Sequence, residues 1–196
     1  MKFRTALVPI AALSLSACGL NSVPTAEENA KAKWADVQAQ YQRRADLVPN
    51  LVATVKGAAA SEGKILTDVM DARAKATSVQ VNANDLTDPA KVQQFQAAQQ
   101  QLGGSLSRLL ATVESYPDLK SQANFTTLMS QLEGTENRIT ISIRDYNQSV
   151  QAYNTRIRTF PDAVGAKIFY GAKPMTPFQA KAGADTAPTV NFGNSN

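Results

Sequence analysis

Three polar residues interrupt otherwise apolar helical stripes, and they are the first candidates for chemistry. They are Glu62, Gln99 and Glu136. At a rise of 1.5 Å per helical residue, all three fall roughly 20–27 Å from one end of a helical bundle, which predicts one polar layer across its interior. Inward-facing carboxylates in such a bundle are typical of di-iron sites, and a pair of them is typical of acid–base hydrolysis.

The composition argues against both kinds of site. The chain has no histidine, whereas di-iron bundles add two Glu-x-x-His motifs, and Ser-His and Cys-His dyads are excluded as well. Gly103-Gly104 lacks the spacing of a phosphate-binding loop. We therefore expect no catalytic residue, metal or cofactor, and interpret the layer as a hydrogen-bonded device that fixes helix register. The alternative is a metal-binding or hydrolytic bundle that uses Glu62 and Glu136.

A second group of polar residues lies between two helical patterns, from Gln42 to Val52. Asp46 is suited to cap a new helix, and Pro49 then falls in its first turn, where a missing N–H costs little. Arg43 and Arg44 lie just before this break. The pattern predicts a corner between two packed helices, and the alternative is one long helix kinked at Pro49.

Arg44 falls within the apolar stripe, so its guanidinium needs a partner or a route to water. In an antiparallel bundle this corner lies at the same end as the turn at 114–118. We therefore expect Glu114 or Asp118 to pair with Arg44. An ion-paired corner that fixes register is the main interpretation, and a ligand-binding rim is the alternative.

The only cysteine follows a segment typical of secretory signals. Lys2 and Arg4 precede an apolar run over 6–15 that is too short to cross a bilayer. The run ends in Leu15-Ser16-Ala17-Cys18, which resembles a bacterial lipobox. The resemblance implies cleavage after residue 17 and acylation of Cys18, and several acyl chains make a stable anchor. An ordinary signal peptide with an incidental cysteine is the alternative.

Four amphipathic patterns account for most of the remaining chain and predict an all-α, antiparallel four-helix up-and-down bundle. The expected helices cover 25–47, 51–78, 89–116 and 125–160, the first capped by Thr25. Asp88-Pro89 predicts the start of the third helix and Tyr116-Pro117 its end. Gly103-Gly104 inside the third helix predicts a bend or a close helix contact.

The last predicted helix carries paired amide and tyrosine residues. They are Asn137, Tyr146, Asn147, Tyr153 and Asn154. Because they lie on or beside the inward stripe, we expect their amides to bond across helices, and a groove for a partner is the alternative. The apolar residues 164–170 and Phe178 are expected to fold back onto the bundle, and 181–196 to be a disordered tail.

The net charge is too balanced for a nucleic-acid-binding protein. It is +4 for the whole chain, and without Lys2 and Arg4 it falls to +2, with 18 basic and 16 acidic residues. The basic residues are spread along the helices, and we expect no nucleic-acid partner.

Several ordered motifs resemble those of the LemA family. The motifs are Arg43 to Val52, including Pro49-Asn50, with Val55-Lys56-Gly57; Glu114 to Leu119, including Tyr116-Pro117; Thr135 to Ile139; and Tyr146-Asn147 to Asn154, ending in Phe160-Pro161. The similarity covers roughly residues 29–178. It implies a helical bundle tethered to a membrane, in a family whose biochemical role is poorly defined.

Together these patterns predict a lipid-anchored envelope protein that acts as an interaction or scaffold module and not as an enzyme. The expected parts are a signal peptide at 1–17, a tether at 18–24, a bundle at 25–180 and a tail at 181–196. The expected partners are the membrane, through Cys18, and other envelope proteins, with self-association a further possibility. Because Gly19 and not aspartate follows Cys18, the location expected in a Gram-negative cell is the outer membrane, facing the periplasm.

Overall fold

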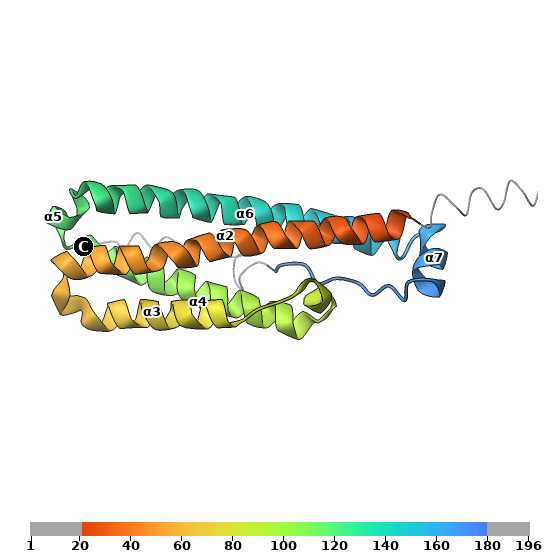
Figure 1. Cartoon of the computed structure of the whole chain (residues 1–196), viewed down its shortest axis with the longest axis horizontal. Coiled ribbons are helices and arrows are strands. Elements are labelled where there is room, and N and C mark those ends of the chain that lie inside the picture. Colours follow the sequence, from red (N-terminus) through yellow and green to blue (C-terminus); the bar gives the residue numbers. More distant parts are fainter. Residues whose placement is uncertain (1–20, 180–196) are drawn as a thin grey trace, which may run out of the picture.

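The computed structural model describes residues 21–179, which form an elongated rod of helices (Figure 1). Its long helices are α2 (Ser22–Ala58), α3 (Gly63–Ser78), α4 (Pro89–Val113) and α6 (Ala123–Arg156). Two short helices, α5 (Pro117–Lys120) and α7 (Asp162–Ile168), lie at opposite ends of the rod (Figure 1). The described residues contain no strand, so the all-α prediction is confirmed for this part of the chain.

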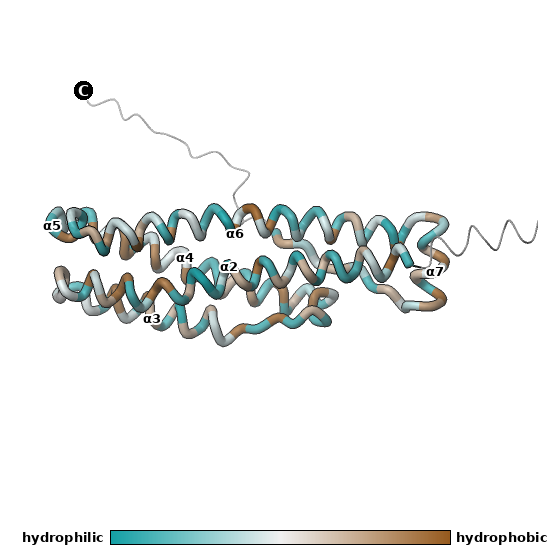
Figure 2. The backbone as a smooth tube through the Cα atoms, turned by 45° about the horizontal axis from the view of Figure 1, so that its top comes forward, coloured by the Kyte–Doolittle hydropathy of each residue, from teal (hydrophilic) through white to brown (hydrophobic). Residues whose placement is uncertain are grey.

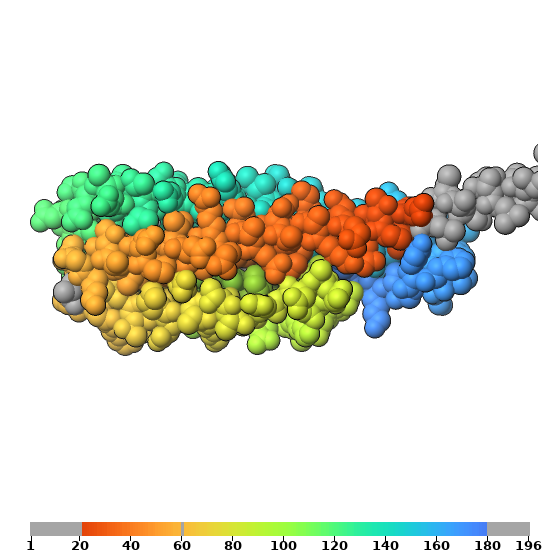
Figure 3. All heavy atoms as spheres, in the orientation of Figure 1, coloured from red at the N-terminus to blue at the C-terminus, as the bar shows by residue number. Residues whose placement is uncertain are grey.

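The helix α2 and the helix α6 form the long half of the rod and pack along each other (Figure 1). At 37 residues, α2 is about 55 Å long. The shorter α3 and α4 pack on each other, and α3 also packs on α2. The space-filling view shows α3 and α4 beside the C-terminal part of α2, while α7 lies next to its N-terminal end (Figure 3).

The predicted start of α4 is correct because its capping chemistry is local, whereas its end falls three residues before the predicted residue 116. Asp88 accepts hydrogen bonds from the backbone N–H groups of Ala90 and Lys91, and Pro89 occupies the first turn of α4. At the other end, α4 stops at Val113, and Pro117 opens α5. An aspartate followed by proline satisfies the free N–H groups of a helix start without tertiary help.

The predicted corner at Pro49 is wrong, because α2 continues through it to Ala58. The chain turns in the short 3₁₀ helix Ala60–Glu62, which begins eleven residues after Pro49. Asp46 caps no helix; its exposed carboxylate instead accepts a hydrogen bond from Gln42 of the preceding turn. The alternative of one long helix is correct only as far as Ala58, because α3 (Gly63–Ser78), which we predicted as part of the same second helix, is separate.

A tertiary hydrogen bond explains how α2 continues past a proline. Pro49 has no N–H, so the carbonyl of Ala45 loses its usual donor four residues ahead. Arg73 of α3 supplies a replacement, since its Nε donates to the Ala45 oxygen at 2.7 Å. Packing between α2 and α3 therefore satisfies the backbone group that Pro49 leaves free.

The N-terminal boundary also differs from the prediction. Thr25 is not the N-cap; α2 begins at Ser22, within the segment that we assigned to the tether. The Thr25 hydroxyl donates to the backbone oxygen of Asn21 at 2.7 Å, a bond typical of threonine inside a helix. The signal segment, Cys18 and the 181–196 tail lie outside the described residues.

Hydrophobic and polar residues alternate along each long helix (Figure 2), as amphipathic packing requires. The buried side chains fall into two clusters. One cluster surrounds Trp34, Phe95, Tyr146 and Phe178; we call it the anchor-end cluster because it lies toward the end of the rod where the sequence predicts the anchor. The far-end cluster surrounds residues such as Val48, Leu102, Leu109 and Leu132. Among the described residues, no helix has both the length and the hydropathy needed to cross a membrane.

Candidate functional site

A thin polar layer separates the two hydrophobic clusters and is the first candidate site. On α2, Arg44 lies between Tyr41 of the anchor-end cluster and Val48 of the far-end cluster. Gln99 occupies the same position on α4, and Glu136 does so on α6. The layer is therefore about one helical turn thick and includes side chains from three helices.

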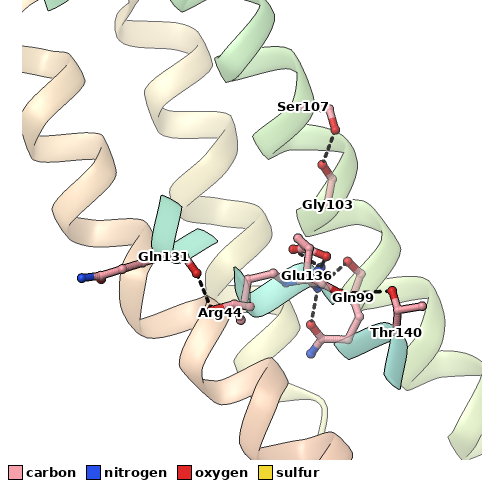
Figure 4. Close-up of polar contacts among 8 residues, drawn as sticks. Arg44, Gln99, Gly103, Ser107, Gln131, Glu136 and Thr140 are labelled. Atoms are coloured by element: carbon pink, nitrogen blue, oxygen red, sulfur yellow. Dashed lines mark hydrogen bonds and ion pairs between the residues drawn. The ribbon is translucent and has the colours of Figure 1, made fainter. Parts of the chain in front are cut away.

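Arg44 lies at the centre of this layer and binds both other helices (Figure 4). Its side chain is only 5% exposed. One terminal nitrogen, Nη1, donates to the Glu136 carboxylate, at 3.1 Å from Oε1 and 3.4 Å from Oε2. The other, Nη2, donates to Gln99 at both its backbone oxygen (2.9 Å) and its side-chain oxygen (2.8 Å). The planar guanidinium thereby joins α2, α4 and α6.

Gln99 extends the layer to a fourth helix. Its Nε2 donates to the backbone oxygen of Ala76 on α3 at 3.1 Å. Gly103, one turn further along α4, borders the guanidinium: a methyl group placed on its Cα would lie 3.7 Å from Arg44 Nη1. Both glycines thus lie in a continuous α4. The distance at Gly103 is an ordinary van der Waals contact, and a methyl group on Gly104 would lie 4.0 Å from Arg108 of the same helix, so neither position shows the close helix contact that we predicted as one outcome.

Tyr41 covers one face of the Arg44 side chain. The guanidinium carbon lies 4.9 Å from the centre of the tyrosine ring, within the range of a cation–π contact. Burial raises the pKa of Tyr41 to about 12, with Arg44 opposing this rise and Glu136 adding to it. The phenol therefore stays neutral around neutral pH and serves as an aromatic surface for the cation.

The partner that we predicted for Arg44 is wrong because the predicted corner is wrong. Arg44 lies in the middle of α2, far from the turn at 114–118, and pairs with Glu136 instead. Glu114 forms an ion pair with Lys120. The polar layer is correspondingly different in composition: Gln99 and Glu136 belong to it, but Glu62 does not.

Glu62 lies at the far end of the rod, in the turn between α2 and α3. The Tyr116 hydroxyl donates to its carboxylate at 2.9 Å and lies 3.2 Å from the Ser61 hydroxyl. Arg44 is 18 positions earlier, which corresponds to more than 20 Å along α2. Glu62 and Glu136 therefore do not face each other, and the paired-carboxylate alternative loses its geometric basis.

Several other predicted residues are exposed and have local roles only. The side chains of Arg43, Asn50, Pro117 and Asn137 do not enter the core. The backbone oxygen of Asn50 accepts a bond from Thr54, one turn ahead. Asn137, which we expected on or beside the inward stripe of α6, faces outward.

The amides further along α6 bind an extended segment of the same chain, residues 171–179, which we call the strap. Asn154 forms two bonds with the backbone of Met175, donating to its oxygen at 2.8 Å and accepting from its N–H at 2.9 Å. Asn147 forms the same pair with Phe178, at 3.0 and 2.8 Å. We expected these amides to bond across helices, and this expectation is wrong.

Aromatic packing secures the strap on the inner side. Phe178 enters the anchor-end cluster, with its ring centre 5.7 Å from that of Trp34 and 6.0 Å from that of Tyr146. The Tyr146 hydroxyl donates to the Thr176 oxygen at 2.9 Å, and the Thr176 N–H donates to Leu86 at 2.8 Å. The predicted return of Phe178 to the bundle is therefore correct.

The chemistry of the polar layer is that of a structural network. Each acceptor that Arg44 reaches belongs to another helix, and Gln99 is itself buried and bonded. Glu136 is the most accessible member, with 46% of its side chain exposed beside a groove of about 440 Å³ between α4 and α6. Within residues 21–179, no group of three or more His, Cys, Asp or Glu side chains is placed to hold a metal ion.

Comparison with known proteins gives a family and several relatives. The chain is 29% identical over 182 residues to magnetosome protein MamQ 1 of Paramagnetospirillum magneticum, a match that covers 85% of this chain and 66% of that protein. It is 29% identical over 184 residues to magnetosome protein MamQ of Magnetospirillum gryphiswaldense, with the same coverage. Protein LemA of Metamycoplasma hominis is 25% identical over 124 residues, 63% of this chain and 52% of that protein.

The chain thus spans just under two thirds of the length of the MamQ relatives and about half of that LemA protein. The family model described as "LemA family" matches residues 33–192, which include the polar layer and the strap. The ordered motifs from Arg43 to Phe160-Pro161 gave the same family from the residues alone. The chain belongs to the LemA family.

Proposed function

We propose that this protein is a non-catalytic scaffold of the cell envelope, held to a membrane by acyl chains on Cys18. In this proposal the four long helices work as one antiparallel up-and-down bundle that presents binding surfaces to other envelope proteins. The observation that carries the proposal is the engagement of Arg44. The side chain best suited to chemistry is buried and bonds α2 to α4 and α6, so it stabilises helix register.

The energetics of this network support a structural role. A buried guanidinium is costly unless its donors are paired. The two terminal nitrogens of Arg44 reach four acceptor atoms, while its buried Nε has no partner among the described residues. A buried, directional contact of this kind favours one register of the three helices over alternatives that purely apolar stripes would also allow. A rigid rod with one defined register is what a scaffold requires.

The sequence and the position of the first described helix support an anchor at one end of the rod. Cys18 is the only cysteine and follows a lipobox-like stretch. Only three residues separate it from Ser22, where α2 begins. A chain this short spans roughly 10–14 Å when extended, so an acylated Cys18 would hold the anchor end of the rod at the membrane. The envelope location and the outer-membrane expectation are parts of this proposal.

Two experiments test the non-catalytic scaffold. Elemental analysis of the protein purified from its host tests the metal alternative: the proposal expects no stoichiometric iron, manganese or zinc, and one equivalent of any of them would contradict it.

Photo-crosslinking in intact cells tests the docking role. The photoreactive residue is placed at Met129, beside the α4–α6 groove, or at the solvent-facing Met70 of α3. A discrete envelope protein captured from position 129 and not from position 70, and lost in Cys18→Ser, is the expected result.

A further inference from the structure

The anchor end of the rod carries a group of exposed apolar side chains, which we call the end patch. Phe160, Val164 and Ile168 are spaced by four residues, and Phe169 and Tyr170 follow. The exposed fractions are 86% for Phe160, 68% for Ile168 and 67% for Phe169. We expected residues 164–170 to fold back onto the bundle, but only Gly165 and Ala166 of α7 are buried. Large apolar side chains grouped in this way mark a surface that contacts another apolar phase.

The position of the end patch relative to the N-terminus indicates what that phase is. The helix α7 contacts α2 and lies beside the N-terminal end of that helix, as Figures 1 and 3 show. Cys18 is only four positions before Ser22, the first residue of α2. Acyl chains on Cys18 would therefore bring a bilayer within reach of α7, because the intervening residues cannot span more than roughly 14 Å.

The exposed basic side chains around the end patch favour contact with an anionic surface. Arg158, Lys167 and Lys173 are exposed on the segments that carry or follow the patch. The acid of α7, Asp162, lies 3.8 Å from Arg156, so its charge is balanced by a neighbouring cation. Aromatic and aliphatic side chains bordered by Lys and Arg are typical of surfaces that rest in the headgroup region of a bilayer with anionic lipids.

We propose that the end patch inserts into the surface of an anionic bilayer and that α7 thereby orients the rod relative to the membrane. This inference rests on the proposed function for the position of the membrane, but the binding chemistry belongs to the patch itself. Two contacts at one end, acyl chains and α7, restrict the tilt of the rod. Acyl chains alone would fix the rod at one point and would not set its tilt.

The first experiment places a polarity-sensitive fluorophore on the patch of the acylated full-length mature protein. Cys18 is the only cysteine, so once it is acylated an introduced thiol is the single labelling site. The label is attached to Ile168→Cys or, as a matched control, to Ile141→Cys, where an exposed isoleucine lies on α6. In vesicles of phosphatidylethanolamine and phosphatidylglycerol, we expect blue-shifted emission and quenching by lipid-borne nitroxide at position 168 only.

The second experiment removes the acyl chains, using the mature chain with Cys18→Ser. Sedimentation with the same vesicles is expected to retain this protein, and the double change Phe160→Ser and Ile168→Ser is expected to lower the bound fraction about tenfold. Ile141→Ser is the control and is expected to bind like the parent. Circular dichroism confirms that each variant keeps its helices.

The outcomes separate this inference from the proposed anchor. A water-like probe at position 168 in the acylated protein would overturn the end-patch proposal and leave the anchor intact. Patch-dependent binding of the Cys18→Ser chain, together with an unmodified Cys18 in cells, would support the patch and remove the anchor. Blue-shifted emission without vesicles that rises with protein concentration would assign the patch to a second copy of the chain and overturn the proposal.

Discussion

Arg73 and Pro49 are coupled through one backbone carbonyl, that of Ala45. We expect Arg73→Leu to lower the free energy of unfolding by about 1–3 kcal/mol, because the Ala45 oxygen then loses its donor. Pro49→Ala restores a backbone N–H that can donate to the same oxygen. In the Pro49→Ala background, Arg73→Leu should therefore cost much less. A double-mutant cycle measured by urea unfolding tests this coupling, and additive effects would contradict the assigned role of Arg73.

Arg43 and Arg44 are adjacent in sequence but differ in burial, which gives a matched comparison. Arg44→Ala should lower the free energy of unfolding by about 2–4 kcal/mol, because it leaves a cavity and removes the donor to Gln99. Glu136 is half exposed, so its loss of a partner contributes little to that cost. Arg43→Ala, at an exposed site, should change stability by no more than about 0.5 kcal/mol. Equal melting temperatures for the two variants would contradict the layer.

The sequence was sufficient to identify Arg44 as a buried cation but not to identify its partner. Its position in an apolar stripe is visible in the spacing of α2 residues. The choice of partner depended on where the chain turns, and Pro49 predicted that turn eleven residues before Ala60, where it begins. No local signal in the sequence shows that Arg73 supplies the missing donor, because the two residues meet only after α2 and α3 pack. The prediction placed Glu62 in the polar layer because it also assumed that the chain turns at Pro49.

At the scale of elements, the strap is held by α6 amides that we expected to bond to other helices. We expect Asn154→Leu to remove both bonds to Met175 and to release the middle of the strap. Hydrogen exchange at Met175 and Thr176 should accelerate by tenfold or more, since two net hydrogen bonds are worth about 1–3 kcal/mol. Asn137→Leu, an exposed position on the same helix, is the control. Unchanged exchange in Asn154→Leu would contradict the assigned role.

Element boundaries were predictable where capping is local and not where it depends on packing. Asp88-Pro89 and Tyr116-Pro117 carry their own capping and stopping chemistry, and α4 and α5 follow them. The continuation of α2 through Pro49 depends on a residue of another helix. The strap lacks regular periodicity of its own, so only the apolar Phe178 signalled its return to the bundle.

At the scale of the whole molecule, the buried tyrosines predict sensitivity to alkali. Burial raises the pKa of Tyr41 to about 12, above the value of about 10 for an exposed phenol. Between these values the folded protein binds more protons than the unfolded chain, so stability is complete below about pH 10 and declines as the pH rises toward 12. Tyr41→Phe should weaken this decline in urea midpoints measured on both sides of pH 10. An unchanged decline in Tyr41→Phe would contradict this assignment.

The two ends of the rod can have different roles only if the anchor end is attached to a membrane. The far end carries the Glu62–Tyr116 turn, and the anchor end carries α7 and the start of α2. An attachment at Cys18 would place the polar layer and the α4–α6 groove at fixed distances from the bilayer. The scaffold role depends on this arrangement, whereas the end patch would contact a bilayer through its own residues.

Mass spectrometry of the mature N-terminus, isolated from membranes of the native host, tests this arrangement most directly. We predict an N-terminal peptide that begins at Cys18, with a diacylglyceryl group on sulfur. We also predict that Cys18→Ser turns a protein that stays in the membrane fraction through a high-salt wash into one that the wash releases, because α7 alone gives only a reversible contact. A native protein recovered in the aqueous fraction with a free Cys18 thiol would contradict the account.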